Sequence, residues 1–193
     1  MARKNELTQE CLQDHLKQGE QVLWSGEAAS FGFLEAEDGK KEVKKMVTAL
    51  VVIPALILGY VSITPNVSTG LIGLALLILL AIPTSAYLTY RTLCRRQYLI
   101  TNRRILVFLG DWLQAYMDLE AADAVAVHNL KSGVDSVALG KPIMTEGSRQ
   151  LRWRSAHPMS DDMGHASGLV LYAIPRADEV VSLLESLTEK EAA

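Results

Sequence analysis

Residues 98–110 read YLITNRRILVFLG, where two apolar runs flank the polar centre Thr101-Asn102-Arg103-Arg104. The runs are rich in β-branched and aromatic side chains, which favour strands, and Asn102 suits the left-handed conformation of a tight turn. The stretch therefore predicts a β-hairpin with strands over residues 97–101 and 104–110. It begins only a few residues after a long apolar region ends.

That apolar region contains two segments with the length of membrane spans. They cover residues 46–63 and 71–90, and no Asp, Glu, Lys, Arg or His occurs between residues 46 and 90. About 20 apolar residues in a helix cross a hydrocarbon core of about 30 Å. The connection between them, TPNVSTG, is uncharged and rich in turn formers. The sequence therefore predicts a two-helix transmembrane hairpin over residues 46–90.

Basic residues flank this hairpin on both sides. Lysines occupy positions 40, 41, 44 and 45, and arginines occupy positions 91, 95 and 96. Because such residues stay on the cytoplasmic side, both termini and the soluble part are expected in the cytoplasm. The cysteines Cys11 and Cys94 are then expected to be free thiols. The absence of ionisable residues at membrane depth argues against transport, so the hairpin is interpreted as an anchor.

The remaining chain is predicted to form short strands and one helix. Residues 21–25 form a strand too short to fold alone, which is expected to pair with the strands after Gln97. Apolar residues at helical spacing near the C-terminus predict an amphipathic helix from Pro175 that closes an open end of a small antiparallel barrel or sandwich. The three tryptophans, Trp24, Trp112 and Trp153, are expected in its core. The later strands are predicted at residues 112–118, 123–128, 134–139, 150–155 and 169–173.

Taken together, these patterns resemble the bacterial pleckstrin-homology (PH)-like membrane proteins. The resemblance rests on GEQVLWSGE before the first span, on Tyr-x-x-Thr-Asn-x-Arg after the second, and on YMDLEAADAVAV and LVLYAIPRADEVVSLLESL. It implies a fold of the α+β, mainly β type: a small antiparallel PH-like β-barrel of about seven strands, capped by a C-terminal helix and interrupted by the hairpin. The expected organisation is an N-terminal amphipathic helix (1–18), a first strand with its linker (19–45), the hairpin (46–90), the barrel with its helix (91–188) and a tail (189–193).

Two groups of side chains are candidate binding residues. The first is a basic set, Arg95, Arg96, Arg103 and Arg104, which could attract an anionic lipid headgroup or a protein partner. The alternative is that Arg95 and Arg96 only enforce topology, while Arg103 and Arg104 are solvated turn residues. The second group comprises His157, Asp161, Asp162 and His165, whose donor atoms suit a metal ion. Their spacing matches no standard motif and their neighbours are loop residues, which favours a solvated loop.

The expected function is that of a non-enzymatic module in the bacterial inner (plasma) membrane. It would recruit or scaffold a protein partner, a membrane protein or a second copy of the chain, at the cytoplasmic face. Recognition of anionic lipid by the barrel is the alternative, and a metal or hydrolytic site at residues 157–165 is a third. No cofactor is expected, because phosphate-binding glycine loops and nucleophile elbows are missing from the sequence. The net charge of -3 gives no reason to expect nucleic-acid binding.

Overall fold

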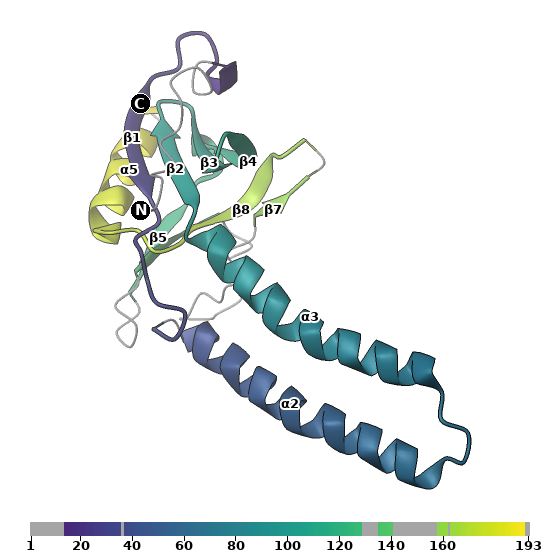
Figure 1. Ribbon diagram of the computed structural model, residues 1–193. Helices are drawn as coiled ribbons and strands as arrows, with labels where there is room; N and C mark the ends of the chain where they lie inside the picture. The colour runs from purple at the N-terminus through teal and green to yellow at the C-terminus, as the bar shows by residue number, and fades with distance from the viewer. Residues whose placement is uncertain (1–13, 36, 129–134, 141–157, 162, 192–193) are drawn as a thin grey trace, which may run out of the picture. The chain divides into compact units, whose positions relative to one another are not determined.

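The computed structural model describes residues 14–35, 37–128, 135–140, 158–161 and 163–191. The chain divides into two compact units. We call the first, Met1–Phe31 with Thr92–Ala193, the β unit, and the second, Gly32–Arg91, the helical hairpin. The helical hairpin is therefore inserted into the sequence of the β unit. Figure 1 shows the elements of both units.

The helical hairpin consists of α2 (Glu37–Ile63) and α3 (Thr69–Leu93). Segments Gly39–Ile63 and Thr69–Leu93 have mean hydropathies of 2.4 and 2.3 and bury almost none of their surface. By length and composition, both helices could cross a membrane. The basic run before the first apolar segment lies inside α2, so this helix begins earlier than the predicted span. Phe33 precedes α2 and Tyr90 lies near the C-terminal end of α3. Their rings pack edge to face with centroids 5.3 Å apart.

The first sheet of the β unit has the order β1-β2-β3-β4, with every pair antiparallel. The β2–β3 hairpin is the one predicted from YLITNRRILVFLG. Both of its strands are buried along almost their whole length. β1 pairs with β2, which confirms that the early strand joins the strands after Gln97. Figure 1 shows β1 beside β2. The strand bounds are β1 (Val22–Glu27), β2 (Arg96–Thr101), β3 (Arg104–Leu109) and β4 (Trp112–Asp118).

The second sheet has the order β5-β6-β8-β7 and is also antiparallel. A short 3-10 helix, η1 (Leu119–Ala121), joins the first sheet to the second. Gly140 ends β6 with a positive φ of 85° and donates its N–H to the carbonyl of Asp123 at 3.0 Å. The strand bounds are β5 (Ala124–Val127), β6 (Ser136–Leu139), β7 (Met159–Ser160) and β8 (Ala166–Leu171).

The main core lies between the two sheets and the C-terminal helix α5 (Ala177–Glu191). Both sheets contribute buried apolar side chains, including Tyr98, Ile105 and Leu139. As the helical spacing predicted, α5 buries Val180 and Leu184 in this core, with Leu183 and Leu187 partly buried beside them. Burying such a stripe supplies the stabilisation that an isolated helix of this length lacks.

The expected antiparallel β-barrel with a C-terminal helix is confirmed in part: the antiparallel strands and the helix are present, but the described residues do not close into a barrel. The described residues form two separate antiparallel sheets and a helix, joined at one point by a bridge between Tyr116 and His165. The edges therefore remain β1 and β4 in one sheet, and β5 and β7 in the other. The expectation that Trp112 lies in the core is wrong, since 65% of this residue is exposed. Trp24 is partly buried against the core. Most of the N-terminal helix prediction, the strand at 150–155 and Trp153 lie outside the described residues.

Candidate functional site

The turn between β2 and β3 holds the segment that leads into β1. The backbone N–H of Asn102 donates to the carbonyl of Gln21 at 3.1 Å, and the Asn102 side-chain oxygen accepts the Gln21 N–H at 2.9 Å. The Asn102 amide nitrogen donates to the carbonyl of Gly19 at 3.4 Å. Two motifs that are about 80 positions apart in the sequence, GEQVLWSGE and the Thr-Asn-x-Arg turn, are therefore direct structural partners.

A buried ion pair lies beside this turn. The Arg104 guanidinium donates two hydrogen bonds to the Glu20 carboxylate, Nε to Oε1 at 2.8 Å and Nη2 to Oε2 at 2.9 Å. The side chains of Arg104 and Glu20 are only 7% and 0% exposed. The hydroxyl of Thr101 donates to Glu20 Oε1 at 2.8 Å, and the backbone N–H of Lys17 donates to Oε2 at 2.7 Å. Paired planar groups of this kind are among the strongest hydrogen-bonded contacts in proteins.

Arg104 makes two further contacts on the outer face of the first sheet, and the first of them holds the chain before β1. Its Nη2 donates to the carbonyl of His15 at 2.6 Å, and its guanidinium lies 5.4 Å from the ring centroid of Tyr116. Next to it, Leu99, Leu106 and Phe108 form a second apolar cluster, against which Leu16, Leu113 and Tyr116 pack. Arg104 is thus the polar centre of a largely apolar face.

Burial by itself would raise the pKa of Glu20, but its hydrogen bonds outweigh this cost. The donors are Arg104, the Lys17 N–H and Thr101, with the Arg104 charge adding to them, and the pKa of Glu20 falls from 4.5 to about 2. The folded state therefore favours the ionised carboxylate. Its contribution to stability is complete above the ordinary pKa of glutamate and declines as the pH falls through about 2.

We predict that Glu20→Gln lowers the stability of the β unit at neutral pH, and that this deficit shrinks as the solution becomes acidic. Protonation removes from the wild-type protein the same charge that the substitution removes. Urea unfolding of the full chain in non-ionic detergent, followed by tryptophan emission at several pH values, measures the difference. A difference between the two proteins that stays constant down to a pH of about 2 would contradict the pairing.

Arg96 and Tyr98 lie on the inner side of β2, where both residues are almost completely buried. Burial raises the pKa of Tyr98 to about 12, and the neighbouring Arg96 opposes that rise. Burial likewise lowers the pKa of Arg96, against a favourable interaction with the Tyr98 hydroxyl. That hydroxyl accepts the Tyr172 N–H at 3.1 Å and donates to the Tyr172 carbonyl at 3.3 Å. Tyr98 therefore links the first sheet to the segment that follows β8.

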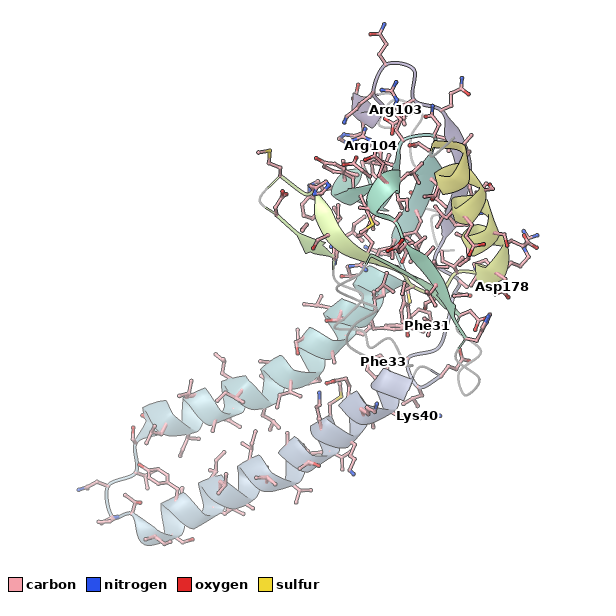
Figure 2. The ribbon with its side chains drawn as sticks, turned by 180° about the vertical axis from the view of Figure 1, so that it is seen from behind. Phe31, Phe33, Lys40, Arg103, Arg104 and Asp178 are labelled. Carbon is pink, nitrogen blue, oxygen red and sulfur yellow. The ribbon has the colours of Figure 1, made fainter. Side chains whose placement is uncertain are left out.

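The four candidate arginines do not form one basic surface. Arg96 and Arg104 are buried, so Arg104 is not the solvated turn residue that one sequence interpretation suggested. Arg95 and Arg103 are exposed. Arg95 precedes β2 and Arg103 follows it, so the length of a six-residue strand, about 17 Å, separates them. Figure 2 shows Arg103 and Arg104 close together near the turn between β2 and β3.

Asp161 and His165 from the candidate metal loop have structural partners. Asp161 Oδ1 accepts the backbone N–H groups of Met163 and His165 at 3.0 and 2.9 Å, which stabilises the turn between β7 and β8. His165 Nε2 lies 3.2 Å from Asp118 Oδ2. Within the described part of the chain, no group of three metal-ligating side chains occurs. His157 and Asp162 lie outside the described residues.

Two polar groups were missed as structural centres by the sequence analysis. Glu20 was considered only as part of the motif GEQVLWSGE, although its negative charge complements the positive charge of the arginines in the turn. His128 bridges Asp135 and Asp178, with Nδ1–Oδ2 and Nε2–Oδ1 distances of 3.3 and 3.1 Å. A hydrogen bond with Asp135 and the charge of Asp178 raise the pKa of His128. The bridge joins the second sheet to the first turn of α5.

Comparisons of the chain with known protein families, with curated proteins and with solved structures found no match. The resemblance to PH-like membrane proteins therefore rests on the sequence motifs. What the geometry adds is a role for the most specific of them: Thr101, Asn102 and Arg104 all bind the segment before β1.

Proposed function

We propose that this chain is a membrane-anchored, non-enzymatic PH-like module that presents its β unit to a protein partner at the cytoplasmic face of the bacterial inner membrane. One observation carries the proposal: the two candidate spans are inserted between β1 and β2, which are neighbouring strands of one sheet. A module inserted in this way is connected to its anchor twice. Two connections limit its rotation and favour the presentation of a defined surface.

The polar residues of the motifs are engaged in structural contacts, which supports a binding module over a catalyst. Glu20, Thr101 and Arg104 bind one another, and Asn102 binds the backbone before β1. These contacts complete the fold. The same burial weakens the alternative of anionic-lipid recognition by the four arginines, because two of them are enclosed and the exposed two lie at opposite ends of β2.

The sheet edges are the surfaces that best suit a protein partner. Among the described strands, β1 and β5 are edge strands, and each carries an exposed apolar side chain: Leu23 is 45% exposed and Val125 is 47% exposed. Edge strands offer backbone hydrogen-bonding groups to a partner, while exposed apolar side chains add burial energy. We therefore assign partner binding to one of these two edges.

The test is affinity purification of the tagged full chain from native membranes in mild non-ionic detergent, with mass spectrometry of the proteins that accompany it. We expect a reproducible partner that is lost from Leu23→Glu or Val125→Glu and retained by Arg103→Ser, an exposed change outside both edge strands. Purification of the chain alone would overturn recruitment of a partner. A partner retained by both edge variants would overturn the assignment to the edges.

A further inference from the structure

Both connections to the helical hairpin leave the β unit from the same end of the first sheet. The N–H of Ala28, just after β1, donates to the carbonyl of Arg96 at the start of β2, at 3.1 Å. The register then runs from Arg96 to Leu109 on β3, and from Leu109 to Trp112 on β4. Neighbouring strands lie about 4.8 Å apart, which places the backbone of Trp112 about 10 Å from that of Arg96. We call this line of residues the tether row.

The chain between α3 and the tether row is very short. α3 ends at Leu93, and the N–H of Arg95 donates to the carbonyl of Thr92 at 3.2 Å, so the chain turns immediately. Three residues can span at most about 10 Å. The uncharged part of α3, residues 69–90, is about 33 Å long and covers a hydrocarbon core of about 30 Å. If α3 spans the membrane, Arg91 lies among the headgroups. The tether row then begins within about 10 Å of the C-terminal end of α3.

Trp112 is the unusual side chain of this row. It is 65% exposed, and it is the only aromatic among the large hydrophobic residues exposed in the described part of the β unit. A tryptophan combines a large apolar ring with an N–H donor, a combination that is enriched at the membrane–water interface. Its neighbour Asp111 is acidic and also exposed, so the turn does not attract anionic lipid through a positive charge. The indole itself is the feature that suits a bilayer.

We propose that Trp112 is an interfacial anchor, whose indole inserts among the headgroups of the bilayer that holds the helical hairpin. This inference rests on the membrane anchoring proposed above and adds a third point of attachment to the two covalent connections. The three attachment points follow one another along the tether row, so together they hold this end of the first sheet at the membrane surface.

The experiment uses the full chain reconstituted into phosphatidylcholine vesicles, with acyl chains brominated near the headgroup as quenchers of tryptophan emission. We expect the brominated lipid to quench the wild-type protein more strongly than Trp112→Gln, because the substitution removes the indole in contact with lipid. The matched variant Trp24→Phe, which changes a partly buried tryptophan of β1, retains the lipid-quenched component. Because the contact depends on the indole, the quenching persists in this zwitterionic lipid and at high salt.

Equal fractional quenching of the wild type and Trp112→Gln would overturn the inference. So would efficient quenching of the Trp112 component by aqueous iodide, since that result would mean that the indole faces water and is open to a protein. An alkaline wash followed by flotation separates the two proposals. If both proteins float with the vesicles, the hairpin anchors the chain and the quenching result decides the role of Trp112. If the wild type is extracted, the anchoring fails and the inference fails with it.

Discussion

Replacing Arg104 by Met is expected to destabilise the β unit by about 3–5 kcal/mol, the usual cost of breaking a buried ion pair from one side. The substitution leaves the Glu20 carboxylate buried without its bidentate partner, and it also removes the hydrogen bond to His15. Because Met fills much of the same volume, the loss reports charge and hydrogen bonding more than packing. The measurement is the shift of the urea unfolding midpoint of the full chain in non-ionic detergent, followed by tryptophan emission.

Arg103→Met is the matched control, because the same substitution is made one residue away at an exposed position. Its effect is expected within about 0.5 kcal/mol of the wild type, as for most surface changes. Adding Glu20→Leu to Arg104→Met should recover part of the loss, since the uncompensated carboxylate is then removed. If Arg103→Met and Arg104→Met cost the same, the Glu20–Arg104 pair does not stabilise the fold.

Local sequence patterns predicted most of the secondary structure in the described residues. Residues 112–118 were predicted as a strand and form β4 with the same bounds. The strands on either side of Asn102 and the apolar stripe of α5 were also found, because alternation and helical spacing can be read from neighbouring residues. The two candidate spans were evident for the same reason: uninterrupted apolar composition is a local property.

Long-range pairing decides the features that the sequence did not reveal. An arginine in a predicted turn is usually solvated, and Arg104 is buried only because Glu20 reaches it from 84 positions away. Arg96 follows a span and looks like a topology signal, yet the pairing of β2 between β1 and β3 buries it. Trp112 has a large apolar side chain of the kind usually found in a core, but it lies on an edge strand beside a turn. The separation of the described strands into two sheets likewise depends on which strand edges meet.

The turn after β6 shows how closely the backbone of the second sheet is packed. Gly140 has a φ of 85°, in the left-handed region that side chains with a Cβ rarely adopt. A Cβ added there would lie 2.5 Å from the carbonyl oxygen of Ser167 and 3.2 Å from the Cα of Gly168. Both obstacles belong to the backbone at β8, which pairs with β6. Relief would require β6 and β8 to move apart.

We therefore expect Gly140→Ala to destabilise the β unit by about 2–5 kcal/mol, from backbone strain of about 1–2 kcal/mol and overpacking of about 1–3 kcal/mol. Gly110→Ala is the matched control, because Gly110 has a φ of 62° and a Cβ there meets nothing within 4 Å. It should show the strain alone, about 1–2 kcal/mol. Thermal unfolding of both variants in detergent measures the difference. Equal losses for the two glycines would mean that β8 yields to the added methyl group, and the close approach of the two strands would then not be a constraint on this fold.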